Sequence, residues 1–431
     1  MAKKRVIIVG TGPTGMFAAL ELSKNPNLEI LMFDSGPDRK TRTENNLTSG
    51  WGGAGAFSDG KLTLPHSNYP QSLKVGGQLS SIIGKEKFLE TIGRVNQIYS
   101  EFGNRLGDKK KLENHDIIKE QQIQKLVDKA SIFGLRLTPT VVHHFGSDLS
   151  PEIARSIKME LEHHQVQIYL ETPVKSVRSK NSGFLVKTIG KYASEYNGDY
   201  VIVAPGRDGA DWLAQEAEVI GIEIEPRTTS VDIGVRVETL QHVLSPLTDY
   251  LYDPKIEFYP KPFEDKVRTF CACPYGEVLI EKYRNKLVTV NGHSLYEKQL
   301  SRNINFAILV SVNFTEPFKE PLKYAARISE LANMLGGKVL IQRLGDLKAG
   351  RRSVPAKINR GLVEPTLKEA TPGDLSFALP HRFLTSILGM IEALDKIAPG
   401  VNGDDTLLYG NEVKFYSSRI KTTSEIGRAH V

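Results

Sequence analysis

The segment Val6-Ile7-Ile8-Val9-Gly10-Thr11-Gly12-Pro13-Thr14-Gly15 decides the fold of this chain of 431 residues. Its first four residues are β-branched and apolar, which favours a buried parallel strand. Apolar residues at helical spacing follow as far as Ser23, and a second apolar run at 30–33 ends at Asp34. The order strand, Gly-x-Gly-x-x-Gly, helix, strand and acid predicts a βαβ unit that binds a dinucleotide.

Each residue of this motif has a physical role in that prediction. Gly10 permits the tight turn, Gly12 lets backbone approach a pyrophosphate, and Gly15 lets the helix pack close to the strand. The helix N-terminus offers unpaired N–H groups and a positive dipole end to the phosphates. Asp34 is placed to accept hydrogen bonds from ribose hydroxyls. The predicted cofactor site also includes Pro13, Thr14 and Ser35.

Two further regions favour FAD over NAD as the dinucleotide. The loop 51–62 is rich in glycine, which implies a close approach of backbone to a ligand. Strands expected between 166 and 196 form a β-meander before the apolar strand 200–203, which runs into Ala204-Pro205-Gly206. That organisation is typical of FAD-binding folds related to glutathione reductase. The loop residues assigned to the cofactor site are Gly52, Gly53, Ala54, Gly55, Asp59, Gly60 and Lys61.

The loop 52–62, with stretches at 233–238, 270–274 and 375–380, resembles the signature of prokaryotic FAD-dependent dehydrogenase-like proteins, which are NAD(P)/FAD-dependent oxidoreductases. The resemblance implies an α/β fold: a Rossmann-like FAD-binding domain with a β-meander, plus an inserted α+β substrate domain. It also implies that the loop lines the flavin side, that Val174 meets adenine through its backbone, and that Ala204 and Gly206 pass near the cofactor. It does not supply a substrate.

We expect an FAD-binding domain at 1–221 with a helical insertion at about 81–134, and a substrate or cap domain at 222–370. Residues 371–431 are expected to return to the FAD-binding domain. Residues 425–431 can be back-translated to the start of a common sequencing-library adapter. We therefore expect this last segment to be truncated and the natural chain to be longer.

Cys271 and Cys273 are weak candidates for chemistry besides the flavin, and no catalytic residue is otherwise assigned. Regular strand alternation would point both thiols to one face. There they could relay electrons as a dithiol, or they could be two small buried side chains, which is the interpretation we favour. Arg236 and Glu238 could bind an anionic substrate, but pairing across a sheet is favoured. No metal site is expected, since only two cysteines exist and the paired histidines lack a third ligand.

Composition bounds the remaining functions. A net charge of +6, 40% hydrophobic residues and ordinary charge content exclude disordered and disulfide-scaffold classes. No apolar run is long enough for a membrane span, and the few cysteines suit the cytoplasm. The sequence thus predicts an FAD-dependent oxidoreductase acting on a small organic molecule, with NAD(P)H docking only transiently because no second Gly-x-Gly-x-x-Gly unit exists. Nucleic-acid binding is not expected. The alternative is a flavin-binding protein with a non-catalytic RNA- or partner-binding role, and an NAD-dependent dehydrogenase is less favoured.

Overall fold

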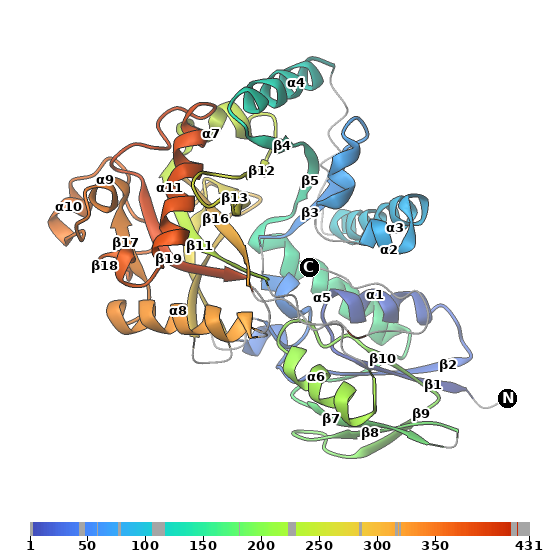
Figure 1. The fold of residues 1–431 in the computed structure, drawn as a ribbon. Coiled ribbons are helices and arrows are strands. Elements are labelled where there is room, and N and C mark those ends of the chain that lie inside the picture. The colour runs from blue at the N-terminus through green and yellow to red at the C-terminus, as the bar shows by residue number, and fades with distance from the viewer. Residues whose placement is uncertain are drawn as a thin grey trace.

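The computed structural model describes residues 3–42, 48–57, 59–75, 79–105, 117–180, 182–222, 230–283, 287–314, 318, 320–414 and 420. The described chain forms two bodies, one around a parallel sheet near the N-terminus and one around a larger sheet (Figure 1). Within these ranges, no helix has the length and apolar character needed to cross a membrane.

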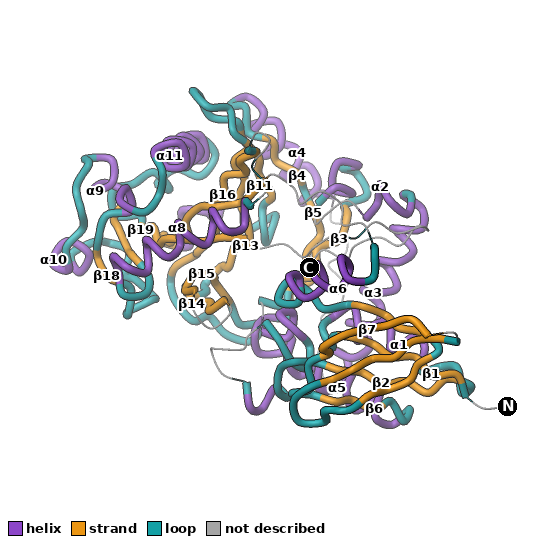
Figure 2. The backbone as a smooth tube through the Cα atoms, turned by 60° about the horizontal axis from the view of Figure 1, so that its bottom comes forward, coloured by secondary structure: helices purple, strands orange, loops and turns teal. Residues whose placement is uncertain are grey.

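The first body is built on a four-stranded parallel sheet in the order β10-β1-β2-β6. The predicted strand–helix–strand unit is present in it as β1, α1 and β2. Figure 2 shows this sheet and the meander gathered as one block, set apart from the second sheet. The elements are β1 (Lys4–Val9), α1 (Pro13–Leu22), β2 (Leu28–Phe33), α5 (Gly146–His163), β6 (Gln167–Tyr169), β10 (Tyr200–Val203) and α6 (Ala210–Val219).

The two faces of the parallel sheet are covered by different layers. Ile8 and Met32 point to one face, where they pack with α1 and α5, while Ile7 and Phe33 point to the other. On that second face lies the antiparallel meander of β7 (Val174–Lys180), β8 (Gly183–Thr188) and β9 (Glu195–Gly198). The alternation of apolar residues along the strands therefore buries both faces, as expected for a parallel sheet.

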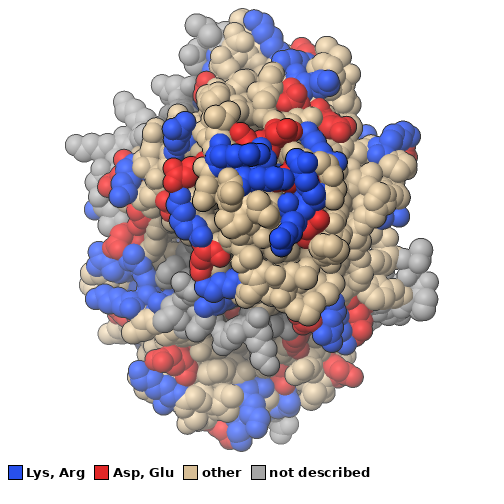
Figure 3. All heavy atoms as spheres, turned by 90° about the vertical axis from the view of Figure 1, so that its left-hand side faces the viewer, with Lys and Arg blue, Asp and Glu red and all other residues tan. Residues whose placement is uncertain are grey.

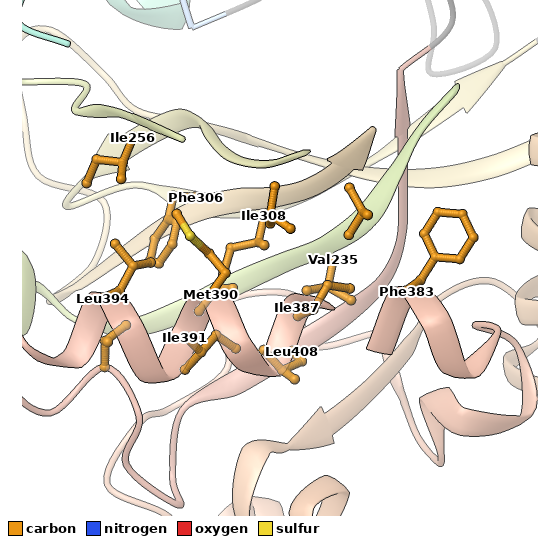
Figure 4. Close-up of a cluster of buried hydrophobic side chains, with 14 of the residues drawn as sticks. Val235, Ile256, Phe306, Ile308, Phe383, Ile387, Met390, Ile391, Leu394 and Leu408 are labelled. Atoms are coloured by element: carbon orange, nitrogen blue, oxygen red, sulfur yellow. The ribbon is translucent and has the colours of Figure 1, made fainter. Parts of the chain in front are cut away.

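The second body is built on an eight-stranded sheet in the order β18-β17-β19-β11-β16-β13-β12-β4. Helix α11 lays Phe383, Ile387 and Met390 across the sheet residues Val235 and Ile308 (Figure 4). The strands are β4 (Arg136–Thr138), β11 (Ser230–Leu240), β12 (Lys255–Phe258), β13 (Lys266–Pro274), β16 (Asn303–Asn313), β17 (Leu340–Arg343), β18 (Thr371–Pro372) and β19 (Leu407–Lys414). The helices are α7 (Gln241–Thr248), α8 (Pro321–Gly336), α9 (Leu344–Lys348), α10 (Pro355–Asn359) and α11 (His381–Asp395), and a hairpin of β14 (Glu277–Tyr283) and β15 (Leu287–His293) completes the body.

The structure corrects the expected return of 371–431 to the first domain. Its described part belongs to the second body, because β19 pairs with both β11 and β17 and α11 packs on the same sheet. β19 adds an inner strand between segments far away in the sequence, which local patterns do not reveal. Residues 425–431, on which the adapter interpretation rests, lie outside the described residues.

The described part of the expected helical insertion joins the two bodies. It holds α2 (Leu79–Ile83), α3 (Lys85–Arg105) and α4 (Ile117–Ile132). Ile98 and Phe102 of α3 pack into the core of the first body, whereas Ile123 and Ala130 of α4 pack into the second. Alongside runs the two-stranded ribbon of β3 (Lys61–Pro65) and β5 (Thr140–His144).

Candidate functional site

The glycine turn after β1 contains two glycines required by packing and one that leaves space. A Cβ added to Gly10 would lie 2.1 Å from the carbonyl oxygen of Ala204, and Gly10 also has a φ of 101°. A Cβ on Gly15 would lie 2.0 Å from the Gly10 oxygen. At Gly12, in contrast, the nearest atom would be Cα of Gly53 at 3.9 Å. The protein itself therefore has room for a side chain at Gly12, so packing within the protein does not require glycine there.

The start of α1 suits a phosphate. Gly12 is its N-cap, no side chain caps this end, and Pro13 occupies the first turn. Thr14 is exposed there, and at Gly206, after β10, a Cβ would meet nothing within 4 Å. Helix N-termini with uncapped N–H groups bind anions. The open backbone at Gly12 and the N-terminus of α1 thus fit the pyrophosphate of a dinucleotide.

The glycine-rich loop lies directly over this turn. The Gly52 N–H donates to the Thr11 carbonyl oxygen at 3.0 Å, and a Cβ on Gly53 would lie 2.9 Å from Gly12 Cα. The 3₁₀ turn Gly53–Phe57, which includes Ala54, places Gly55 against Pro13. The structure therefore brings most of the predicted cofactor residues together. Val174 is buried between the parallel sheet and the meander, where it packs with Val9, and its contact with adenine stays a prediction.

Asp34 binds the protein's own backbone at this site. Its Oδ2 accepts from the N–H and the hydroxyl of Thr11, at 2.8 and 2.9 Å. Its Oδ1 accepts from the N–H groups of Gly36 at 2.9 Å and Gly50 at 2.6 Å. Ser35 is exposed beside it. Asp34 is thus the tether between the glycine turn and the loop, and a ribose would share these oxygens, so the ribose contact stays a prediction.

Arg42 is a cofactor candidate that the sequence patterns did not single out. Its guanidinium donates to the carbonyl oxygens of Gly53 at 2.8 Å and Trp51 at 2.6 Å. Burial lowers the pKa of Arg42 to about 10, so the side chain is charged at neutral pH. It places a cation beside the loop that covers Gly12. An arginine eight residues after an acid has no motif of its own, which explains why it was missed.

A second cluster lies where the loop meets the second body, around Asp59 and Lys61. Asp59 is buried and accepts from the N–H and hydroxyl of Ser294 at 2.5 and 2.6 Å. Its Oδ2 lies 2.8 Å from Nζ of Lys61. Burial alone would raise the pKa of Asp59, but the Lys61 charge and a hydrogen bond from His144 outweigh it and hold that pKa well below its usual range. Asp59 and Lys61 are therefore a buried ion pair, and Gly60 between them takes a φ of 65°.

The cluster contains a serine, a histidine and an aspartate but not a nucleophilic triad. Nε2 of His144 lies 3.2 Å from Oγ of Ser294 and 3.3 Å from Oδ1 of Asp59. A triad needs the two partners on different ring nitrogens. Tyr252 joins the same network, with its hydroxyl 3.1 Å from His144 Nε2 and 2.9 Å from Ser294 Oγ. Burial and the Asp59 charge raise the pKa of Tyr252, so its hydroxyl keeps its proton at neutral pH.

Cys271 and Cys273 lie beside this cluster, on β13. The predicted alternation is interrupted, because the register of β13 shifts between Phe270 and Cys273 and Cys271 has a φ of 49°. A bulge of this kind re-aims side chains. Both sulfur atoms nevertheless come close to Nζ of Lys61, at 3.5 Å for Cys271 and 3.6 Å for Cys273. The thiols thus meet through a bulge and not through regular alternation.

Arg236 and Glu238 pair within the sheet, as favoured from the sequence. Arg236 is fully buried and lies 3.4 Å from Glu412 on β19, while its Nε donates to Asn305 at 2.8 Å. Its Nη2 donates to the Cys271 carbonyl oxygen at 2.8 Å and lies 3.2 Å from the Cys273 sulfur. Glu238 accepts from the Tyr409 hydroxyl. Arg236 therefore connects the bulge in β13 to Glu412 on β19.

Two further observations concern the rest of the chain. Among the described residues, no group of three His, Cys, Asp or Glu side chains is arranged to hold a metal ion.

The face in Figure 3 carries Lys and Arg side chains interspersed with Asp and Glu. In the second body, Arg351 and Lys357 both pair with Asp346, at 2.8 and 2.9 Å. On this face, therefore, basic side chains alternate with acidic ones.

Comparison with known proteins supports FAD as the cofactor. Residues 230–415 match the sequence-family model of the C-terminal domain-like region of FAD-dependent proteins. An uncharacterized protein from Clostridium beijerinckii is 24% identical over 448 aligned positions, which cover 96% of this chain and 72% of the relative. The second body thus matches a domain class found in FAD-dependent proteins, and the first body carries the dinucleotide turn.

Solved structures of two enzymes are similar to this chain at low TM-scores. Glycine oxidase from Geobacillus kaustophilus matches with a TM-score of 0.37 and 12% identity, over 96% of this chain and 84% of the oxidase. L-amino acid deaminase from Proteus vulgaris matches with a TM-score of 0.33 and 11% identity, over 55% of this chain and 54% of the deaminase.

Proposed function

We propose that the protein is an FAD-dependent oxidoreductase that passes hydride or electrons between a small organic substrate and a second acceptor. The observation that carries the proposal is the turn at Gly12, where the protein leaves space for a Cβ although the flanking Gly10 and Gly15 have none. The match of residues 230–415 to FAD-dependent proteins supports the same cofactor. NAD(P)H, as donor or product, would dock transiently.

The residues divide the work between binding and proton handling. FAD, when bound, supplies the two-electron chemistry of its isoalloxazine ring. The α1 N-terminus and Gly12 would hold the pyrophosphate, with Arg42 as a further cation and Asp34 keeping turn and loop together. Lys61 and Tyr252 hold protons beside the loop, where a substrate that gains or loses hydride needs a proton donor or acceptor.

The test is FAD binding by matched glycine variants. The purified chain is titrated with FAD, followed by flavin fluorescence, and its absorbance is then recorded under anaerobic NADH and NADPH. We expect Gly12→Ala to fold and to weaken FAD binding by about tenfold or more, because the added methyl group keeps the pyrophosphate from approaching the backbone closely. Gly93→Ala is the control, since a Cβ there meets nothing within 4 Å and the residue lies on α3. Wild-type protein that binds no FAD, or equal binding by both variants, would refute the proposal.

A further inference from the structure

The two thiols of the chain form a compact group with two buried cations. Both sulfur atoms lie within 3.6 Å of the Lys61 ammonium nitrogen, and the Cys273 sulfur also lies 3.2 Å from Arg236. The Lys61 side chain is 8% exposed and that of Arg236 is fully buried. Cys273 is buried as well, whereas Cys271 is half-buried. Two small structural side chains do not need two buried cations at their sulfur atoms.

The backbone of β13 brings the sulfur atoms together. In a regular strand, residues two apart lie roughly 6.6 Å from each other, at the long end of the range a disulfide allows. Here the strand is not regular, since Cys271 adopts a φ of 49° and the register shifts before Cys273. The Cys271 carbonyl oxygen is held by Arg236 and that of Ala272 by Lys61. The bulge is therefore fixed on both sides by the same two cations that touch the sulfur atoms.

We propose that Cys271 and Cys273 form a reversible dithiol–disulfide site that reacts with small organic disulfides. Cys271 is the attacking sulfur and Cys273 the resolving one, because only Cys271 is partly open to solvent. The inference goes beyond the proposed function and does not depend on it, since the pair lies entirely in the chain's own residues and reacts without FAD.

The surroundings of the pair separate the roles of the two sulfur atoms. A hydrogen bond from Cys273, together with the charges of Lys61 and Arg236, outweighs burial and lowers the pKa of Cys271 to about 5. Burial and the neighbouring Cys271 and Asp59 raise the pKa of Cys273. At neutral pH, Cys271 is thus a thiolate and Cys273 keeps its proton, as a nucleophile and a resolving thiol require. The charged and titratable groups around the pair are Asp59, Lys61, Arg236, Tyr252 and Asp253.

The reaction balances in two displacements. The Cys271 thiolate attacks a disulfide RSSR, forming a Cys271–S–SR bond and releasing RS⁻. Cys273 then loses its proton to the released thiolate and attacks the Cys271 sulfur, so the second RS⁻ leaves and takes a proton from solvent. The two cysteines together lose two electrons, the small disulfide gains them, and two molecules of RSH are formed. The reverse reaction regenerates the dithiol.

The test exposes the FAD-free chain of 431 residues to oxidised glutathione and follows it by intact mass and peptide mapping. We expect wild type to form an intramolecular disulfide, Cys273→Ser to stop as a mixed disulfide at Cys271, and Cys271→Ser to stay unmodified. Lys61→Met should slow the reaction at pH 7 by about tenfold, because each unit by which the thiol pKa rises above 7 cuts the thiolate fraction about tenfold. Lys266→Met is the matched control, because Lys266 lies on β13 with the two cysteines but pairs with Glu257.

Circular dichroism first establishes that each variant is folded, and the serine variants decide the result if Lys61→Met is not. Two free thiols in folded wild type after excess oxidised glutathione would overturn the inference, as would equal reactivity of Cys271 and Cys273. Because FAD is omitted, failure of FAD binding leaves this outcome unaffected. Repeating the oxidation after FAD addition shows separately whether cofactor and thiols exchange electrons.

Discussion

The glycine turn after β1 and the bulge in β13 are both backbone irregularities, but they are held in opposite ways. The turn is maintained by absence of side chains, since a Cβ at Gly10 or Gly15 would strike a carbonyl oxygen. The bulge is maintained by presence of side chains, because Arg236 and Lys61 donate to its two carbonyl oxygens. Glycine accepts a left-handed backbone without strain, whereas Cys271 does so only while its neighbours hold it.

This difference concerns what each region can bind. A turn made of glycines offers bare N–H groups and room, which suit a phosphate. A bulge held by cations gathers positive charge at one point, which suits a thiolate. The first region therefore fits the binding of a cofactor, and the second fits chemistry by the chain itself.

The largest effect is expected from removing the cation under the bulge. Arg236→Met leaves a fully buried Glu412 with Lys414, at 2.7 Å, as its remaining ion-pair partner among the described residues, and frees the Cys271 carbonyl. Breaking one side of a buried ion pair costs about 3–5 kcal/mol, so we expect unfolding free energy to fall by about 4 kcal/mol in urea titration. Arg327→Met is the control, since Arg327 is 80% exposed and its pair with Glu330 contributes about 0.5 kcal/mol or less. Equal losses would show that the bulge does not depend on Arg236.

The next effect is the difference in stability between substitutions at Gly15 and at Gly12. Gly15→Ala forces a Cβ to within 2.0 Å of the Gly10 oxygen, so strand and helix must move apart. Overpacking of this kind costs about 3 kcal/mol. Gly12→Ala meets no such contact and should cost about 1 kcal/mol, the order of an N-cap change. Urea titration of both variants without FAD measures this, and similar losses would mean that Gly12 serves packing and not a ligand.

The two regions also differ in how far the sequence predicts them. The turn is local, so the spacing of Gly10, Gly12 and Gly15 was sufficient, and the strands and meander around it were found. The bulge depends on Arg236 and Lys61, which lie far from Cys271 in the chain, and regular alternation therefore predicted the wrong geometry. The same reason explains why the segment after 371 was assigned to the first domain. β19 joins its sheet by pairing with β11 and β17, and no local pattern encodes a long-range strand order.

A third prediction uses pH to distinguish the two regions. The pKa of Cys271 is about 5 in the folded chain and about 8.5 in an unfolded one, so between these values the unfolded state binds one more proton. Stability relative to Cys271→Ser should therefore rise from pH 5 to pH 8, by up to about 1.4 kcal/mol per unit and by about 3.5 kcal/mol in total. It should be lost again as pH falls through 5. The stability difference between Gly15→Ala and wild type should not change with pH in this way. If the unfolding free energies of wild type and Cys271→Ser instead changed with pH in parallel, Cys271 would not be a thiolate in the folded chain.

The smallest effect concerns the backbone of the bulge alone. At Cys271 the φ of 49° favours glycine, so Cys271→Gly should be about 1 kcal/mol more stable than Cys271→Ala, because a left-handed backbone costs a Cβ about that much. At Val267, earlier on the same strand and in regular register, the order should reverse, since glycine weakens an extended strand by a similar amount. Thermal and urea unfolding of the four variants measures both differences. If alanine were the more stable residue at both positions, β13 would be regular at Cys271, and the thiols would have to meet by some means other than the bulge.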